Sequence, residues 1–290
     1  MSITGNNNFQ SQLSTEIEDL RAIIKNWKKE GHTIGFVPTM GALHVGHESL
    51  IKEAKKHCSK VVVSIFVNPT QFGPNEDYNK YPRTLEKDMA ICANNTVDIV
   101  FSPTVSEMYP EIENLTGVCP PENFQNKLCG LTRAGHFDGV ATVVLKLLNI
   151  VQPDKAFFGQ KDAQQLIIIK KICLDLNIPV EIIGCPIIRD ADGLAISSRN
   201  IYLSLEAREK ALSLSRVLKK IQELYSNKIT DKQEILIAAK KIIHPDVELE
   251  YLEINNINTL EPLNKVKSGS LIAIAARVDG VRLIDNIIIE

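Results

Sequence analysis

The spacing of apolar positions predicts helices and short strands that alternate through the first two thirds of the chain. Residues 16–30 have the apolar spacing of a helix, which ends in lysines followed by Gly31. Residues 60–67 are instead continuously apolar and β-branched, which is typical of a strand buried on both faces of a parallel sheet. The other predicted strands are residues 33–37, 97–101, 155–158 and 180–184, and the other predicted helices are residues 46–57, 84–95, 138–151 and 163–176.

The pattern changes after about residue 187. Residues 205–226 and 231–243 are predicted to form two successive helices, and residues 248–254 a strand. Two further β runs flank Asp279-Gly280, a strong signal for a hairpin. The chain is therefore predicted to be an α/β protein, with a Rossmann-like parallel-sheet domain at residues 1–187 and a smaller C-terminal α+β domain at residues 188–290. Residues 1–15 are predicted to be a loose polar lead.

Composition narrows the class of protein. Of the 290 residues, 44% are hydrophobic and 23% charged, as in ordinary soluble globular proteins. The net charge of -2 offers no basic surface for nucleic acid, and no apolar run is long enough to span a bilayer. The first residues lack the basic and apolar regions of a signal peptide, and the six cysteines are scattered without a C-x-x-C pair. We therefore expect a cytoplasmic protein with reduced thiols and no nucleic-acid or membrane partner.

The most informative segment follows the first predicted strand and reads PTMGALHVGH, residues 38–47. Gly41 and Gly46 allow the backbone to approach a ligand closely, and the helix that begins beyond them offers free N–H groups to a polyphosphate. His44 and His47 can donate hydrogen bonds to phosphate oxygens. A structural role for each histidine and a metal-binding pair are the alternatives, but no third ligand stands at a useful spacing. The segment favours a phosphate site.

Two other predicted strands also end in polar loops. Asn68 and Gln71 follow residues 60–67, at the strand end where α/β proteins bind ligands, and their amides suit hydroxyl and carboxylate groups. Gly159, Lys161 and Asp162 follow residues 155–158, and Asp162 stands where a helix N-cap is expected. Taken alone, the first loop fits a simple turn equally well, and the second fits a capped helix with a solvated lysine.

Near the predicted domain junction, residues 189–200 read RDADGLAISSRN. Two hydroxyls followed by Arg199 suit an anion clamp, since guanidinium forms charge-assisted bonds to phosphate. A charged surface loop is the alternative for this segment.

Together these segments resemble a known superfamily and one family within it. The HxGH loop with a late SSRN resembles the nucleotidyl-transferases that include class I tRNA synthetases. The fuller set is similar to the pantothenate synthetase (pantoate–β-alanine ligase) family, and its motifs run in order from about residue 34 to 203. These motifs are PTMGALHxGH, FVNPTQF, YPRT, LCGxxRxGHFxGVxTVV, FFGxKDxQQ and RxxDGLAxSSRN.

The resemblance implies a two-step reaction of pantothenate and coenzyme A biosynthesis. ATP and pantoate give pantoyl adenylate and pyrophosphate, and the amine of β-alanine then displaces AMP to give pantothenate. It also implies that Mg²⁺ accompanies ATP and that the enzyme is a cytoplasmic homodimer. A nucleotidyl-transferase acting on a phosphorylated substrate would share HxGH without the NPTQF and KDxQQ loops, and an ATP-sensing module would not need the SSRN segment.

The resemblance also implies roles for individual residues. His47, His44 and Lys161 are the expected catalytic residues. Gln71, Gln165, Asn68 and Arg133 are expected to bind pantoate and β-alanine, with His136 beside them. The expected ATP-binding residues are Met40, Gly41, Ala42, Leu43, His44, Val45, Gly46, His47, Gly159, Gln160, Lys161, Asp162, Ile188, Ile196, Ser197, Ser198 and Arg199.

Three positions depart from the family pattern. Ala134 replaces a common proline, and Ala163 replaces a common aromatic residue. After YPRT, where some members carry adjacent acids, Lys87 precedes Asp88, which leaves Asp88 as the candidate magnesium ligand.

Overall fold

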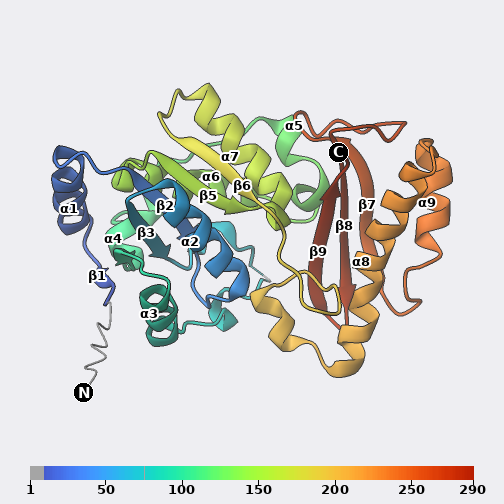
Figure 1. The fold of residues 1–290 in the computed structure, drawn as a ribbon, viewed down its shortest axis with the longest axis horizontal. Helices are drawn as coiled ribbons and strands as arrows, with labels where there is room; N and C mark the ends of the chain where they lie inside the picture. Colours follow the sequence, from blue (N-terminus) through green and yellow to red (C-terminus); the bar gives the residue numbers. More distant parts are fainter. Residues whose placement is uncertain (1–9, 75) are drawn as a thin grey trace, which may run out of the picture.

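The structure is a computed structural model, and it describes residues 10–74 and 76–290. Two sheets organise the chain, as Figure 1 shows. The first has six parallel strands in the order β1-β4-β3-β2-β5-β6, and the second has three antiparallel strands in the order β7-β8-β9. The predicted fold class, a parallel-sheet α/β part followed by a smaller α+β part, is confirmed.

Most elements of the first part lie where the hydrophobic pattern predicted them, but the pattern did not predict the short β1, α4 and α5. Its strands are β1 (Gln12–Ser14), β2 (Ile34–Thr39), β3 (Lys60–Ile65), β4 (Ile99–Phe101), β5 (Lys155–Gly159) and β6 (Glu181–Cys185). Its α-helices are α1 (Ile17–Lys29), α2 (Val45–His57), α3 (Leu85–Asn94), α4 (Val105–Met108), α5 (Glu122–Gln125), α6 (His136–Val151) and α7 (Ala163–Asp175).

Strand β1 corrects the predicted loose lead of residues 1–15, of which residues 1–9 lie outside the described part of the chain. Residues 12–14 pair in parallel with β4, with Leu13 opposite Val100. Three residues are too few to show an alternating pattern, and Leu13 is largely exposed. The pairing therefore depends on the edge that β4 offers and not on a local signal.

Strand β3 shows why the parallel sheet needs helices on both faces. Val62 packs in the core on one side with α1 and α6, whereas Val61 and Val63 pack on the other side with α2. All three side chains are fully buried. Successive side chains of a strand point to opposite faces, so a continuous apolar run requires cover on both.

The second part contains helices α8 (Leu205–Ser226) and α9 (Lys232–Lys240), and strands β7 (Glu248–Asn256), β8 (Ser270–Val278) and β9 (Val281–Ile288). The predicted hairpin between β8 and β9 turns at Asp279 and Gly280, both with positive φ (47° and 80°), as a tight hairpin turn requires. Helix α8 packs on this sheet around a second core. The boundary at residue 187 stays a prediction.

The two parts meet through apolar and polar contacts. Ile168 of α7 shares a buried cluster with Leu271 and Ala273 of β8. The Asn286 side chain on β9 donates to the carbonyls of Gln160 and Lys161, at 3.0 and 2.9 Å. The second sheet therefore fixes a loop at the carboxyl end of β5.

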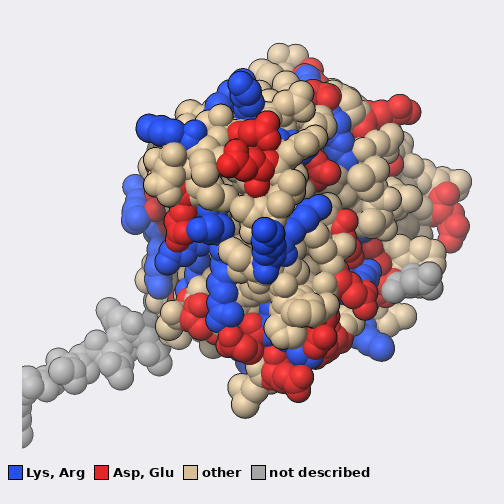
Figure 2. All heavy atoms as spheres, turned by 90° about the vertical axis from the view of Figure 1, so that its right-hand side faces the viewer, with Lys and Arg blue, Asp and Glu red and all other residues tan. Residues whose placement is uncertain are grey.

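On the face drawn in Figure 2, acidic and basic side chains are intermixed. No helix in the described part of the chain is long and apolar enough to cross a membrane.

Candidate functional site

The strand order reverses beside β2, and the predicted ligand loops meet there. From β2 the chain adds β3 and β4 on one side, and later β5 and β6 on the other. Open α/β sheets bind ligands outside the carboxyl ends of the strands at such a reversal. The loops that follow β2, β3 and β5 are the three strand-end loops that the sequence singled out.

Hydrogen bonds to Asp88 of α3 fix the backbone of the loop after β2. Gly41 and Ala42 have positive φ (81° and 50°), so the backbone turns sharply before α2. The two carboxylate oxygens of Asp88 accept the N–H groups of Ala42 and Leu43, at 3.0 and 2.8 Å. These two hydrogen bonds fix the loop in front of the first turn of α2.

These contacts bear on the predicted magnesium ligand. Asp88 is 1% exposed, also accepts from the Thr84 hydroxyl at 3.2 Å, and lines neither of the two cavities that form the site. No group of three or more His, Cys, Asp or Glu suited to a metal occurs in the described part of the chain. Asp88 therefore has the contacts of a residue that shapes the loop, not those of a metal ligand.

His44 and His47 cap the N-terminus of α2 with their rings. The Gly46 N–H donates to Nδ1 of His44 at 3.1 Å, and the His44 N–H donates to Nδ1 of His47 at 3.3 Å. Because each Nδ1 accepts from a backbone N–H, each neutral ring carries its proton on Nε2. Both rings therefore have one donor left for a ligand.

The surroundings keep these two rings neutral. Burial, together with the nearby Lys161, lowers the pKa of His44 to about 4. Burial, His44 and Lys161 lower the pKa of His47 to about 3. At neutral pH the pair thus offers uncharged N–H donors, and positive charge must come from other residues.

Gln71 lines the same cavity as this histidine pair and comes from the loop after β3, within the short 3₁₀ helix Pro69–Gln71. Its Oε1 accepts from Asn68 Nδ2 at 3.0 Å, and its Nε2 donates to the Met40 sulfur at 3.3 Å. The Gln71 carbonyl accepts from His136 Nδ1 at 2.8 Å. Both the side chain and the backbone of Gln71 are thus held in place.

Arg133 and His136 form the support behind Gln71. Since Nδ1 of His136 donates to the Gln71 carbonyl, Nε2 is the acceptor for Arg133 at 2.8 Å. Burial and the adjacent Arg133 lower the pKa of His136 to about 4, which keeps Nε2 free to accept. Arg133 also makes a bidentate pair with Glu76, at 2.7 and 2.6 Å.

Lys161 reaches the site from the loop after β5. Its Nζ lies 3.9 Å from Asp162, a loose pair that leaves the ammonium available to an anion. Asp162 occupies the N-cap position of α7, as predicted, but its side chain makes no capping hydrogen bond. Asp162 instead lines both cavities.

The SSRN segment closes the site from the other side. The Tyr81 hydroxyl lies 3.3 Å from Ser198 Oγ, and Arg199 makes a bidentate pair with Asp77, at 3.1 and 2.9 Å. Burial opposes the charge on Arg199, but Asp77 outweighs it and raises the pKa of the guanidinium. The Ile196 N–H bonds the Ile188 carbonyl at 3.0 Å, which sets these two apolar side chains beside each other.

Two adjoining cavities collect these residues. The smaller, of about 240 Å³, brings together most of the predicted site: Met40, His44, Gly46, His47, Asn68, Gln71, Arg133, Gly159, Lys161, Asp162, Gln165, Ile188, Ile196, Ser197, Ser198 and Arg199. The predicted residues Gly41, Ala42, Leu43, Val45 and Gln160 do not line it. Val45 is exposed, and Leu43 is buried.

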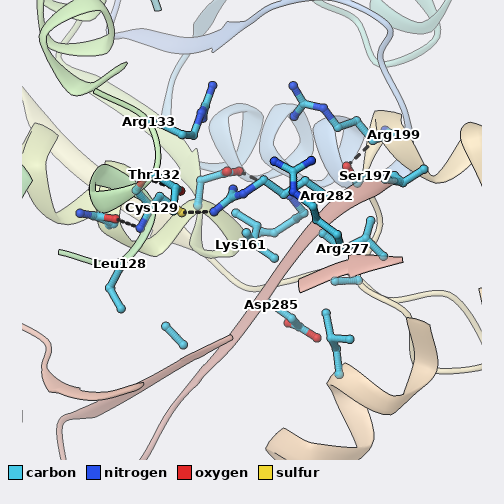
Figure 3. Close-up of a pocket in the computed structure, with 18 of the residues that line it drawn as sticks. Leu128, Cys129, Thr132, Arg133, Lys161, Ser197, Arg199, Arg277, Arg282 and Asp285 are labelled. Atoms are coloured by element: carbon cyan, nitrogen blue, oxygen red, sulfur yellow. Dashed lines mark hydrogen bonds and ion pairs between the residues drawn. The ribbon is translucent and has the colours of Figure 1, made fainter. Parts of the chain in front are cut away.

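The larger cavity, of about 520 Å³, lies between the two sheets, and Figure 3 shows the basic side chains that gather at it. Lys161, Arg133 and Arg199 line it together with Arg277 and Arg282 of the second sheet. Both Arg277 and Arg282 pair with the single carboxylate of Glu250. The cavity is therefore rich in positive charge beside the smaller one.

Sequence reasoning missed several residues of this region. Tyr81 stands within the YPRT segment, a signal that could have found it. Asn286 and Arg282 come from β9, and Glu76 and Asp77 from a segment without any local pattern. Their roles depend on contacts between distant segments.

Chemically, the site can hold a polyphosphate and an oxygen-rich small molecule side by side. Two imidazole N–H groups, an ammonium and a guanidinium supply donors for phosphate. The Gln71 and Gln165 side chains line the same cavity with neutral amides.

Comparisons with known proteins agree with this picture. A model of the pantoate-beta-alanine ligase family matches residues 12–288. A curated pantothenate synthetase from Caldicellulosiruptor saccharolyticus is 49% identical over 281 residues, which cover 95% of this chain and 98% of that relative. A bifunctional pantoate ligase/cytidylate kinase from Thermosynechococcus vestitus is 53% identical over 261 residues, covering 89% of this chain. The chain spans about half of that bifunctional relative, 51%.

Solved structures are similar over nearly the whole chain. The pantothenate synthetase of Thermus thermophilus matches with a TM-score of 0.91 and 43% identity, covering 95% of this chain and 98% of that one. The pantoate-beta-alanine ligase of Francisella tularensis, solved with beta-gamma ATP and beta-alanine, matches with a TM-score of 0.80 and 38% identity, covering 96% and 97%.

Proposed function

The chain belongs to the pantoate-beta-alanine ligase family, and from that premise we propose how its site carries out the reaction. The enzyme condenses pantoate with β-alanine, with consumption of ATP, to give pantothenate. Its products besides pantothenate are AMP and pyrophosphate. We assign each of the two chemical steps to residues of the smaller cavity.

In the first step, a carboxylate oxygen of pantoate attacks the α-phosphorus of ATP. The bond from that phosphorus to the bridging oxygen breaks, and pyrophosphate leaves. The Nε2–H groups of His44 and His47 donate to the phosphate oxygens, while Lys161 and Arg199 supply positive charge for the departing pyrophosphate. Gln71 and Gln165 hold pantoate in line with this attack.

In the second step, the amine of β-alanine attacks the carbonyl carbon of pantoyl adenylate. The bond from that carbon to the phosphate oxygen breaks, AMP leaves, and the new amide nitrogen loses a proton. The fixed positions of Gln71 and the phosphate donors keep the adenylate oriented for attack, which is the contribution expected from a site that acts by positioning.

One observation carries this proposal: the phosphate donors and the glutamine amides line the same cavity of about 240 Å³. A nucleotide site alone would not need the linked amides of Asn68 and Gln71 in the same cavity as the histidine pair. To activate a carboxylate with ATP, the groups that bind phosphate and the groups that bind the carboxylate substrate must lie within reach of each other.

Magnesium belongs to the proposal as a partner of ATP. Mg²⁺ is usually held by one or two carboxylates together with substrate phosphates, and the described residues contain no cluster that could hold it alone. Asp162 is an acid that lines the phosphate side of the cavity, and it fits this limited role. The cation would offset phosphate charge.

We also propose that the enzyme works in the cytoplasm as a homodimer, as the family resemblance implies. The six free cysteines, five of them buried, support a reducing compartment. Sedimentation of the purified chain would measure the mass of the assembly directly.

The test is a product assay on the purified chain. With ATP, pantoate and β-alanine, AMP should form in proportion to pantothenate, and pantoate alone should support exchange of labelled pyrophosphate into ATP. Phosphorylated alcohols should not replace pantoate in the exchange. ADP in place of AMP, or exchange that depends on a phosphorylated alcohol, would reject the adenylate reaction.

A further inference from the structure

Tyr109 lies behind the site without reaching it. It follows the short helix α4, is 2% exposed, and belongs to the core on the α6 side of the parallel sheet. Its hydroxyl donates to Asn68 Oδ1 at 2.8 Å. Burial raises the pKa of this phenol to about 12, so it remains a donor throughout the physiological range. No motif pointed to this residue.

The orientation of the Asn68 amide is determined by partners that can act only as a donor or only as an acceptor of hydrogen bonds. Nδ2 faces the carbonyl of Gly139 at 3.1 Å, and a carbonyl can only accept. Oδ1 accepts from the Thr70 N–H at 3.4 Å, and a backbone N–H can only donate; the Thr70 hydroxyl also donates to Oδ1, at 3.0 Å. Asn68 is 1% exposed, so water cannot take the place of these partners. Its second Nδ2 hydrogen must therefore point at Gln71 Oε1, 3.0 Å away.

This arrangement decides which end of the Gln71 amide is offered to a ligand. Because Oε1 is taken by Asn68, Nε2 is the end directed toward Met40, on the wall of the cavity. A thioether sulfur is a weak acceptor. An oxygen placed in the cavity would be a better partner for this donor.

We propose that Tyr109 is a positioning residue: its hydrogen bond to Asn68 adds to those of Gly139 and Thr70 and holds Asn68, and through it the Gln71 amide, with Gln71 Nε2 toward the cavity. The site then selects a substrate group that accepts hydrogen bonds. The group is a carboxylate or hydroxyl oxygen of the hydroxy acid, not the ammonium of the amino acid. Asn68, predicted from sequence as a substrate-binding residue, is reassigned to positioning. This inference rests on the proposed function.

The first experiment measures the pantoate KM by pyrophosphate exchange in the wild type and in Tyr109→Phe. Phenylalanine keeps the ring and removes only the donor. The loss of one hydrogen bond corresponds to a rise in the pantoate KM of about 2- to 10-fold, with the ATP KM unchanged. Met108→Leu is the control, because Met108 is fully buried in the same core but has no link to Asn68. It should change thermal stability without changing the pantoate KM.

A double-mutant cycle then tests whether Tyr109 acts through Gln71. In a Gln71→Ala background, Tyr109→Phe should raise the pantoate KM no further, because the group that it positions is gone. An equal rise in both backgrounds would mean that Tyr109 acts by another route, and it would overturn the inference.

The last comparison tests which end of the amide the substrate meets. Gln71→Glu keeps an acceptor for Asn68 but turns an oxygen toward the cavity, so an anionic substrate should be repelled. The pantoate KM should therefore rise more in Gln71→Glu than in Gln71→Ala. The opposite order would show that Gln71 offers its oxygen to a donor. An inactive wild type would reject the proposed function and this inference together, whereas an active wild type with an unchanged KM in Tyr109→Phe would reject the inference alone.

Discussion

The imidazole rings of His44 and His47 lie with their centroids 4.0 Å apart, and both are bonded through Nδ1 to the backbone at the start of α2. Helix capping and ligand binding are therefore done by opposite edges of the same rings. The cap requires each Nδ1 to be unprotonated, and this leaves Nε2–H for the phosphates. Protonation at Nδ1 would break the cap and change the site at once.

A first prediction concerns pH and stability. The folded-state pKa values of His44, His47 and His136 are about 4, 3 and 4, against 6.5 for an unperturbed histidine. Between pH 7 and pH 5 the unfolded chain thus binds more protons, so the free energy of unfolding must fall as pH falls. Each histidine contributes a slope of at most about 1.4 kcal/mol per pH unit.

Urea unfolding at pH 5, 6, 7 and 8 measures this dependence. His136→Gln should reduce the slope between pH 7 and pH 5, since one of the three buried rings no longer titrates. A slope that is flat over this range in the wild type would contradict the neutral-ring assignment.

A second prediction concerns the close approach of α6 to the Gln71 loop. A Cβ at Gly139 would lie 2.3 Å from the Thr70 carbonyl oxygen and 2.7 Å from the Cα of Gln71. Gly139→Ala must therefore push the loop away, and we expect the free energy of unfolding to fall by about 1–3 kcal/mol. The pantoate KM should rise more than the ATP KM.

Gly117→Ala provides the comparison, because its Cβ would meet only Thr142 Oγ1, at an ordinary 3.7 Å. Chemical denaturation and pyrophosphate exchange on both variants separate the two cases. Equal increases in both Michaelis constants for Gly139→Ala would mean that the damage spreads through the whole site and not through the Gln71 loop.

A third prediction concerns Asp88. Asp88→Asn removes one of the two acceptors for the Ala42 and Leu43 N–H groups, and bonds to charged groups are worth about 1.5–3 kcal/mol. We expect the ATP KM to rise by about 10- to 100-fold, with the Mg²⁺ concentration for half-maximal activity unchanged. Lys87→Ala, at the neighbouring exposed position, should affect neither quantity. A higher magnesium requirement in Asp88→Asn alone would restore its role as a ligand.

Local sequence signals were enough to locate the loops that form the site. The β-branched run at Lys60–Ile65 and the glycines on either side of the start of α2 carry information within a few residues, so they predict a buried strand and a phosphate loop. Carboxyl ends of parallel strands share one edge, and the prediction that these loops meet follows from the fold class alone.

Roles that depend on long-range pairing could not be read in this way. Asn68 lines the smaller cavity, as predicted for a substrate-binding residue, and its amide also bonds Tyr109, Gly139 and Gln71, which no local pattern indicated. Arg199 looks like a free clamp, but Asp77, 122 positions earlier, holds it in a bidentate pair. Such partners become visible only when the chain is folded.

The final prediction is that His47 and Lys161 act on the phosphates during adenylate formation and are not needed for the second step. His47 is held by its cap at the start of α2, and Lys161 arrives from the loop after β5, so they approach the transferring group from different strands. Positioned donors of this kind contribute about 2.7–4 kcal/mol to the barrier, or about 100- to 1,000-fold in rate. We expect Lys161→Ala and His47→Asn to slow adenylate formation by about that factor.

The two edges of the His47 ring allow matched variants. Asn places an oxygen near the position of Nδ1 and keeps the cap, whereas Gln places a donor near Nε2. His47→Gln should therefore retain more adenylate-forming activity than His47→Asn, and His47→Asn should keep more thermal stability than His47→Ala. The reverse order of activities would mean that the cap, and not the donor, is what catalysis needs from this residue.

The two half-reactions distinguish this role from the alternatives. When pantoyl adenylate is supplied ready-made, no pyrophosphate has to leave, so His47→Asn and Lys161→Ala should recover much of the wild-type rate with β-alanine. If the two residues only held loops in shape, the variants would lose thermal stability and both half-reactions together. If His47 were a metal ligand, its variants would instead lose bound zinc. Rates of each half-reaction, measured on folded variants with their metal content, decide among the three, because only phosphate stabilisation separates the first step from the second.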